Sequence, residues 1–504
     1  MPKLYVFAIG GTGSRVVKSL TMLLASGIKT NYEIVPIILD PDAAAADVEK
    51  TTRILNNYKA VHKYVNVSSA DSLFKNKVES LGDVVNPKTN EHISNEFRLN
   101  INNLNGGSFR SFIDFNLLEK KGNNQAMIEL LFSDQNLDLD LEVGFQGNPN
   151  IGSVVLNKFV DSSEFAQFAQ NFTDQDRVFI ISSIFGGTGA AGFPLILKNI
   201  REGHVQGHNF EHLKNAVVGA VTVLPYFKLD GDADEAIQSA TFISKTKAAL
   251  SYYHTNITKV DSINSLYYIG DTASNNYKNI VGGSEQKNDA HFVELASAIA
   301  VLDFASDDSL SSYGGRAVGA KYKEFGIDSI DSSNPVITFP NLALSTQNLI
   351  KESLSQLFFT CLYLDNELSN QMKAPFAANQ PVFDTNFLSS HFYQSLNGFL
   401  KEFKIWLGEL KRNKVSFAPY DFHVESDSIG NVTGFTTNRR DIFTLLNGVA
   451  TKSTGLNFFK NRSYDVITAQ LSTLSKNRTF ISAESKLLEL FTEATKQSIN
   501  KELF

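Results

Sequence analysis

Apolar residues in the first half of the chain fall into short, nearly continuous runs that are separated by longer segments of helical spacing. Five of these runs predict strands: Lys3–Ile9, Glu33–Leu39, Arg177–Ser182, Asn215–Leu224 and Ser265–Ile269. Strands that are apolar along their whole length are typical of a parallel sheet covered by helices on both faces. The pattern therefore predicts an α/β fold with a doubly wound, mostly parallel, Rossmann-like sheet.

The remaining periodicity predicts helices and divides the chain into three parts. Helices are expected at about residues 14–25 and over Phe193–Arg201, Ala236–Tyr253, Leu349–Leu364 and Asn386–Leu410. Residues 1–288 carry the strand pattern, with an irregular, Asn-rich insert at about 48–140. Residues 289–305 form a strongly apolar helix, which predicts a core helix between two layers. Loop-like stretches such as "SDDSLSSYGG" then open a divergent α+β C-terminal domain over residues 306–504.

Composition narrows the possible functions. Hydrophobic residues make up 42% of the 504 residues, which is enough for a sizeable core. The formal net charge of −7 argues against a general nucleic-acid partner, because such proteins need a basic face. The single cysteine, Cys361, lies in an apolar segment and predicts a buried thiol in a reducing compartment. No signal peptide or membrane-length apolar run is visible, so a cytoplasmic protein is expected.

Two glycine-rich loops each stand between a predicted strand and a predicted helix. They are "GGTGS", Gly10–Ser14, and "GGTGA", Gly186–Ala190. Glycine lets the backbone approach an anion closely, and helix N-termini offer unpaired N–H groups at the carboxyl edge of such a sheet. Neither loop has the spacing of a dinucleotide fingerprint or of a Walker loop. Each is a weak signal alone, but two on separate strands predict a grip on one di- or triphosphate from both sides.

The loops and their neighbours resemble the tubulin/FtsZ superfamily, in five segments that follow the order of that family. "RVFIISSIFGGTGAAGFPLI" is similar to the tubulin signature, and "FAIGGTGSRVV" to the first glycine loop of FtsZ. "ILDPDAA" stands where FtsZ carries an Asn-Thr-Asp-Ala loop. "GFQGNPNIG" and "AVTVLPYFKLDG" are similar to the loops near the phosphates and the ribose. Phe185 and Ala191 replace the first and last glycines of the signature. The region after about residue 305 matches the family poorly, and the chain there resembles divergent bacterial FtsZ-like proteins.

The resemblance implies a nucleotide-binding, GTPase-like domain that holds GTP or GDP together with Mg²⁺. The implied nucleotide-binding residues are Gly10, Gly11, Thr12, Gly13, Ser14, Gly147, Asn148, Gly186, Gly187, Thr188, Gly189, Ala190, Asp230 and Phe292. In this set Asp230 would meet the ribose hydroxyls and Phe292 would stack on the base. Asp40 and Asp42 are implied near Mg²⁺. The residues themselves leave two alternatives open, a capped turn at Asp40 and Asp42 and an ordinary core position for Phe292.

The catalytic residues are unknown. FtsZ completes GTP hydrolysis with acidic residues that one subunit presents to the nucleotide of the next, but no matching Asn-x-Asp-x-x-Asp loop follows Phe292. Asp303, Asp307 and Asp308 come too soon after it. Asn341 lies about where such a loop would come, but an amide cannot take a proton from water as a carboxylate does. Weak or absent hydrolysis is therefore part of the expectation.

Three functions follow from these observations. The first is a GTP-binding, tubulin-like cytoskeletal protein that self-assembles head to tail into filaments, because a heterologous contact does not close. The second is a nucleotide-binding scaffold without useful hydrolysis, which recruits a protein partner or membrane adaptor through its C-terminal half. The third is an NAD- or FAD-dependent oxidoreductase built on the first glycine loop alone. Separately, "HVQGHNFEH" spaces three histidines for zinc, but Gly203 and Gly207 favour a polar loop there.

Overall fold

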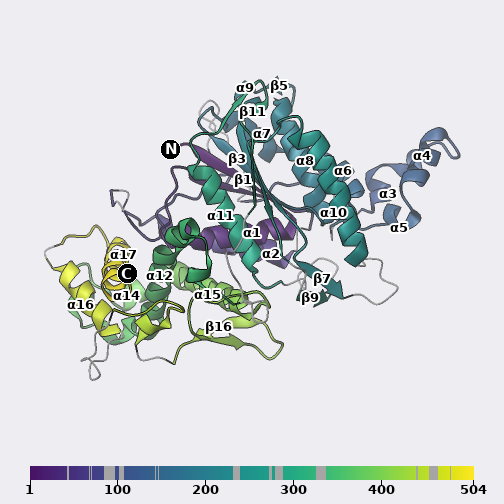
Figure 1. The fold of residues 1–504 in the computed structure, drawn as a ribbon. Coiled ribbons are helices and arrows are strands. Elements are labelled where there is room, and N and C mark those ends of the chain that lie inside the picture. The colour runs from purple at the N-terminus through teal and green to yellow at the C-terminus, as the bar shows by residue number, and fades with distance from the viewer. Residues whose placement is uncertain are drawn as a thin grey trace.

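A six-stranded sheet with both faces covered forms the centre of the computed structural model (Figure 1). The structure describes residues 1–42, 45–66, 68–69, 71–84, 97–101, 107–141, 144–145, 147–230, 239–271, 275–278, 288–324, 336–438, 441–452, 464–476 and 478–504. The strands run β12-β8-β6-β3-β1-β2, and every pairing is parallel. Their bounds are β1 (Lys3–Ile9), β2 (Glu33–Leu39), β3 (Arg177–Ser183), β6 (Val217–Val223), β8 (Ser265–Ile269) and β12 (Lys321–Glu324). The predicted doubly wound α/β sheet is confirmed.

Alternate side chains of the strands face the two helical layers. One layer contains α1 (Gly10–Ala25), α2 (Ala46–His62) and α11 (Phe292–Ser306), and the other α6 (Pro149–Leu156), α7 (Ser163–Asn171), α8 (Gly187–Glu202) and α10 (Ser239–Tyr253). Tyr5 and Phe7 stack edge-on against Phe168 of α7, at 4.9 and 5.1 Å between ring centroids. Phe179 meets Phe304 of α11 at 5.2 Å. Both faces of β1 and β3 are therefore buried, as their apolar sequences predict, whereas the edge strand β12 is partly exposed.

The core helix α11 begins at Phe292 and is buried on nearly every side. Beyond it the chain returns to the main sheet, because β12 pairs with β8 at the sheet edge. The sheet thus includes a strand from beyond residue 305. A hairpin of β10 (Ser311–Tyr313) and β11 (Arg316–Val318) precedes that strand. The domain boundaries given by the sequence stay predictions.

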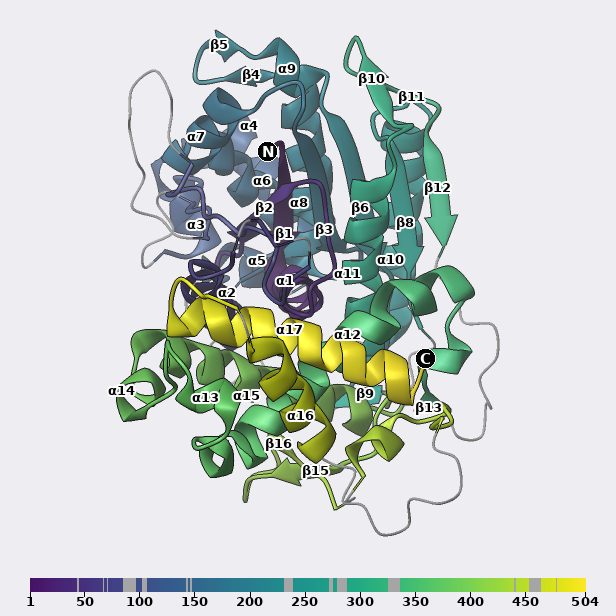
Figure 2. The same ribbon diagram turned by 90° about the vertical axis from the view of Figure 1, so that its left-hand side faces the viewer.

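The C-terminal part is a helical body with small sheets, which confirms the expected α+β class (Figure 2). Its long helices are α12 (Leu344–Asn366), α15 (His391–Arg412), α16 (Tyr464–Ser475) and α17 (Ala483–Glu502), and its strand pairs are β13 (Val336–Ile337) with β14 (Ser416–Phe417) and β15 (His423–Ser426) with β16 (Val432–Thr436). Helix α15 joins it to α1, because Trp406 Nε1 donates to Ser19 Oγ at 3.1 Å. Cys361 is buried, as predicted.

The insert after α2 first runs beside β2 and then leaves the body. Bridges join Ile34 to Val78 and Ile38 to Arg98. Next come α3 (Phe109–Phe112), η1 (Phe115–Leu117), α4 (Asn123–Leu131) and α5 (Asp134–Leu137), which stand apart from the main body in Figure 1. We call residues 107–141 the arm.

The remaining elements are short. They are β4 (His204–Val205), β5 (His208–Asn209), α9 (Glu211–Lys214), β7 (Phe227–Asp230), β9 (Asn275–Lys278), η3 (Asn157–Asp161), η4 (His254–Thr258), η5 (Phe339–Asn341), η6 (Leu368–Gln371), α13 (Pro375–Ala378), α14 (Thr385–Leu388) and η7 (Ile442–Leu445). The histidine-rich segment, expected to be a polar loop, forms the β4–β5 hairpin. In the described part of the chain, no helix is both long and apolar enough to cross a bilayer.

Candidate functional site

The two glycine loops flank the point where the strand order of the sheet reverses. Strand β1 lies between β2 and β3, so the chain winds outward in one direction through β2 and in the other through β3. The first loop follows β1 and the second follows β3. Ligands of open α/β sheets bind at such a switch point, outside the carboxyl ends of the strands. The fold therefore places both loops where a ligand is expected.

The loops contact each other at this edge. Gly10 has φ +69°, a conformation that favours glycine, and a β-carbon built on it would lie 3.6 Å from the β-carbon of Thr188. Gly13 and Gly189 allow each helix to lie against its own strand. A β-carbon on Gly13 would lie 2.6 Å from the carbonyl carbon of Ala8, and one on Gly189 would lie 2.5 Å from the carbonyl oxygen of Ser183. Both helix starts are thereby fixed at the carboxyl edge of the sheet.

Helices α1 and α8 begin inside the loops, at Gly10 and Gly187. The sequence placed their starts later, near residues 14 and 193, because glycine is a poor helix former. That placement was wrong, so all of Gly10–Ser14 lies in α1 and Gly187–Ala190 opens α8. Among the described residues no side chain caps either start, and neither first turn contains an acidic residue. The first N–H groups of two 16-residue helices thus face the same edge without a side-chain partner.

A third predicted segment lies against the second loop. A β-carbon on Gly187 would lie 3.2 Å from the amide nitrogen of Gly147 and 3.0 Å from that of Asn148. Gly147 itself has φ +73°. Lys245 of α10 donates from Nζ to the carbonyl oxygen of Gly147 at 2.6 Å, so a cation lies at this loop. Burial lowers the pKa of Lys245. The structure therefore brings together the three glycine-containing segments that the sequence named.

A buried ion cluster centred on Arg15 lies beside the first loop. Arg15 Nε donates to Glu294 Oε1 at 2.5 Å and a terminal nitrogen donates to Asp47 Oδ2 at 2.6 Å. The other terminal nitrogen donates to Tyr226 Oη at 3.0 Å, and Tyr226 donates to Glu294 at 2.9 Å. Burial lowers the pKa of Arg15, but Tyr226, Glu294 and Asp47 outweigh it and hold that pKa above its usual value. The cluster joins α1, α2, α11 and the segment after β6.

The two aspartates proposed for Mg²⁺ lie at the end of β2. The backbone nitrogen of Asp42 donates to Asp40 Oδ1 at 3.1 Å, which makes a local turn. Burial raises the pKa of Asp40 to about 7, and the backbone hydrogen bond only partly offsets this. Among the described residues, no three His, Cys, Asp or Glu side chains gather closely enough to hold a metal. Mg²⁺ is often held by one or two carboxylates with substrate phosphates and water, and Asp40 and Asp42 suit that role.

The last two residues proposed for the nucleotide site are Phe292 and Asp230. Phe292 begins α11, is 6% exposed, and its ring lies 5.6 Å from that of Phe417. This packing fits the core position that the sequence left as an alternative to stacking on a base. The backbone of Asp230 ends strand β7, and its side chain lies outside the described residues.

His291 precedes α11 and lies near the Arg15 cluster. Its Nδ1 accepts from the backbone nitrogen of Val293 at 3.1 Å, so the ring caps the helix. Its Nε2 lies 3.9 Å from Asp271 Oδ2, at the end of β8. The ring is also 4.9 Å from that of Tyr226. Burial lowers the pKa of His291, which keeps the imidazole neutral as a cap acceptor.

Sequence reasoning missed Arg15, Asp47, Tyr226, Glu294 and Lys245. A signal existed for two of them. Glu294 is the sole acidic residue in the first turn of a strongly apolar helix, and Arg15 directly follows a glycine loop. Buried charges are almost always paired, so each predicts a partner. The identity of that partner could not be predicted, because the two residues are far apart in the chain.

Comparisons with known proteins give fold-level likenesses only. No family model and no curated protein matches the chain. Solved structures match at low identity: an FtsZ mutant from M. jannaschii (15% identity, 53% of this chain and 46% of that chain, TM-score 0.25) and a GTPγS-bound protofilament of CetZ2 from Haloferax volcanii (11%, 60% and 58%, 0.29). A GTPγS-form protofilament of TubZ from Bacillus thuringiensis also matches (13%, 80% and 81%, 0.26). The match spans about half the length of the FtsZ chain. Overlaps this loose do not define a function.

Proposed function

We propose that this protein binds a guanine nucleotide, GTP or GDP with Mg²⁺, between its two glycine loops and self-assembles head to tail as a cytoplasmic, tubulin-like cytoskeletal protein. The observation that carries the proposal is the convergence of two uncapped helix N-termini at the switch point of the sheet. Their unpaired N–H groups and partial positive charges suit a polyanion. The backbone of Gly147 and Asn148 and the ammonium of Lys245 would close the phosphate side. The residues named above as nucleotide-binding keep that proposed role, except Phe292, whose packing against Phe417 favours a core position.

The placement of acidic residues at the opposite end of the sheet supports a head-to-tail arrangement. Helix α11 has its start beside the glycine loops and its end beside Arg177, at the beginning of β3, which donates to the carbonyl oxygens of Phe304 and Asp307. Fifteen residues of α-helix span about 22 Å. One end of the domain thus offers N–H groups, and the other carries the carboxylates of Asp303 and Asp307, which are ion-paired with Lys323 and Lys321. A stack of copies would bring the two ends together.

A second candidate, binding without useful hydrolysis, is favoured by how these groups are occupied. Asp303 accepts from Lys323 Nζ and Tyr267 Oη, both at 2.5 Å, and Asp307 accepts from Lys321 Nζ at 2.6 Å. Asn341 Oδ1 accepts from the nitrogen and the hydroxyl of Thr338, so its amide caps a short helix. Ion-paired carboxylates and a capping amide are poor proton acceptors. On this reading the C-terminal half recruits a protein partner or membrane adaptor.

The arrangement of the two glycine loops does not favour the oxidoreductase. A dinucleotide site needs the first loop alone, whereas here the second loop contacts the first through Thr188. We therefore expect calorimetric titration to detect GTP and GDP but not NAD or FAD. Tight NAD binding with no GTP binding would reverse the assignment.

The decisive variant is Gly187→Val, measured by calorimetric titration with GTP and by light scattering. A β-carbon at Gly187 would press on the backbone nitrogen of Asn148 and on the β-carbon of Phe145, each 3.0 Å away. Displacing the third segment should weaken GTP binding at least about 100-fold. Gly107→Val is the control, since Gly107, like Gly187, lacks a positive φ, and a β-carbon there would meet Ser111 only at an ordinary contact distance of 3.8 Å. Phosphate release by the wild type then separates the two candidate functions. Background release alongside measurable GTP affinity would favour the scaffold without useful hydrolysis, and release well above background would count against it.

A further inference from the structure

The arm presents apolar side chains to solvent on α4, beside a small core that includes Phe109, Leu137 and Leu141. Helix α4 has no buried residue, and Met127, Leu130 and Leu131 are 62%, 87% and 58% exposed. Leu117, at the end of η1, is 82% exposed. Figure 1 shows this element at the far edge of the molecule, away from both domains. Large apolar side chains gathered on a projecting element mark an interaction surface.

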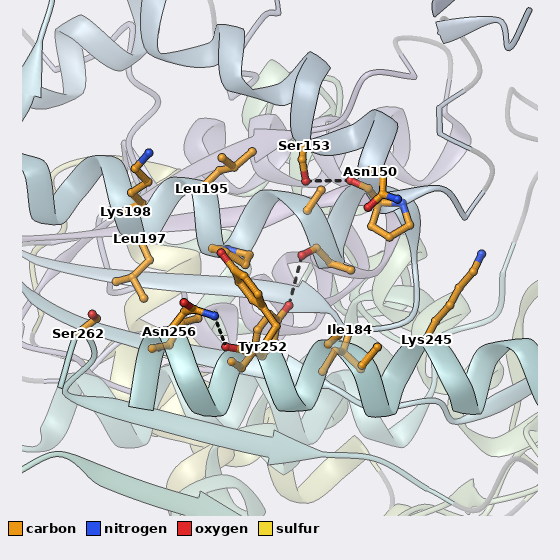
Figure 3. A pocket seen from close by; sticks show the side chains of 18 of the residues that line it. Asn150, Ser153, Ile184, Leu195, Leu197, Lys198, Lys245, Tyr252, Asn256 and Ser262 are labelled. Carbon is orange, nitrogen blue, oxygen red and sulfur yellow. Dashed lines mark hydrogen bonds between the residues drawn. The ribbon is translucent and has the colours of Figure 1, made fainter. Parts of the chain in front are cut away.

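A cavity of about 770 Å³ lies on the same molecule between α8 and α10, next to the start of α6 (Figure 3). Its wall is largely apolar and includes Phe185, Leu195 and Leu197 with Tyr252 and Ala249 of α10. Tyr252 is 52% exposed at the mouth. The cavity is of the size that holds bulky apolar groups in other proteins.

The helix geometry gives this cavity a preformed wall. Pro194 lies inside α8 and cannot donate the usual hydrogen bond to the carbonyl of Ala190. The hydroxyl of Tyr253 donates to that carbonyl at 3.4 Å and ties α10 to α8 across the cavity. Because this contact holds the two helices at their spacing, a guest would enter an existing space.

The charges of the two surfaces are opposite. The arm carries six acidic residues, Asp114, Glu119, Glu129, Asp134, Asp138 and Asp140, against three basic ones, Arg110, Lys120 and Lys121. The cavity is lined by Lys198, Arg201 and Lys245 against Glu202 alone. In Figure 3 Lys198 and Lys245 lie toward opposite ends of it. An acidic, apolar projection and a basic, apolar cavity are complementary in charge as well as in polarity.

We propose that the arm of one copy inserts Met127, Leu130 and Leu131 into the α8–α10 cavity of a second copy. The contact joins two different surfaces, so each copy keeps one arm or one cavity free for the next. The cavity shares Gly186, Ala190 and Lys245 with the proposed nucleotide site, but the contact forms without nucleotide, and the variants below leave those three residues in place. A membrane is a less suitable partner for the arm, because its acidic residues would be repelled by anionic lipid.

The test uses variants that break one surface each and leave the fold intact. Met127→Ser/Leu130→Ser removes two exposed side chains from the arm. Ala248→Glu places a long acidic side chain at an exposed cavity position, with Lys198→Glu as a second cavity variant. Ile481→Ser is the matched control, since Ile481 is 88% exposed in the C-terminal part. Thermal melting shows that each variant folds.

Sedimentation velocity without nucleotide then reports association. We expect the wild type and Ile481→Ser to form concentration-dependent oligomers, and each single-surface variant to lose at least about 100-fold in association constant. In an equimolar mixture, the intact arm of the cavity variant should bind the intact cavity of the arm variant. The resulting dimers should grow no further, because the arm and the cavity that remain free both carry substitutions. Fluorescent GTP binding should be unchanged in all of them, which separates this result from the nucleotide proposal.

Three outcomes would overturn the proposal. The first is a wild type that stays monomeric to about 100 μM. The second is a cavity variant that associates as strongly as the wild type, which would point to arm-to-arm pairing. The third is flotation of the wild type, but not of the arm variant, with vesicles of zwitterionic lipid, which would assign the arm to a membrane.

Discussion

Gly10 lies against Thr188, with only 3.6 Å between a β-carbon built on the glycine and the threonine β-carbon. The two residues open different helices after different strands, and this contact brings those helix starts to one place. The convergence is what turns two weak sequence signals into one candidate anion site. It also identifies a position where a substitution should affect GTP binding more than the stability of the fold.

Gly10→Ala should weaken GTP binding while costing little stability. The left-handed φ of +69° opposes any β-carbon, so we expect a loss of about 1 kcal/mol in the free energy of unfolding. The same strain re-aims the first N–H groups of α1, and GTP affinity should fall at least tenfold. Gly207→Ala, at φ +82° and in open space, should show the same stability loss without the binding defect. Equal GTP affinity in the two variants would remove Gly10 from the site.

Arg15→Leu should strongly destabilise the fold. It leaves Glu294 and Asp47 buried without their cation, and breaking a buried pair in this way typically costs about 3–5 kcal/mol. Urea unfolding followed by circular dichroism measures the loss. Arg110→Leu, which removes an arginine paired with Asp134 and Asp138 on the arm, should leave the transition in place. If the urea transition of Arg15→Leu were also unchanged, the cluster would be dispensable for folding.

Asp40 should make the protein less stable as the pH rises through 7. Burial raises its pKa in the folded state to about 7, above its ordinary value of 3.8, so its contribution is complete below about pH 4 and lost as the pH passes 7. Asp40→Asn should remove on the order of 2 kcal/mol of this pH dependence between pH 5 and 8. Urea titrations at both values measure it, with the exposed Asp161→Asn as control. Mg²⁺ with GTP should reverse the trend, because a bound cation favours the ionised carboxylate.

Glu409 should make the joint between α15 and α1 sensitive to acid. Burial alone would raise its pKa, but Lys18 and Lys50, at 3.0 and 2.8 Å, lower it to about 2. A depressed pKa gives stability that is present above about pH 4.5 and is lost as the pH falls toward 2. Glu409→Gln should therefore lower stability at pH 7 by about 2 kcal/mol and flatten the acid limb. The exposed Glu425→Gln should change neither, and an unaltered acid limb in Glu409→Gln would contradict the assignment.

The sequence was most informative where structure depends on near neighbours. Strand β1 was predicted at its observed bounds, because seven consecutive residues form one short buried run. The helix starts were predicted too late. Glycine disfavours a helix interior, but at Gly10 and Gly187 the same residue opens the first turn and lets the helix lie close to its strand.

The sequence by itself determined the parallel α/β sheet, the core helix and the two glycine loops, because buried strands and helices carry local periodicities that can be counted along the chain. Only the tertiary structure decided that Gly10 meets Thr188, that Arg15 pairs with Glu294, and that the arm projects from the main body. These relationships join residues far apart in the chain. Their free energy depends on distance and burial in the folded state, and no local pattern encodes either quantity.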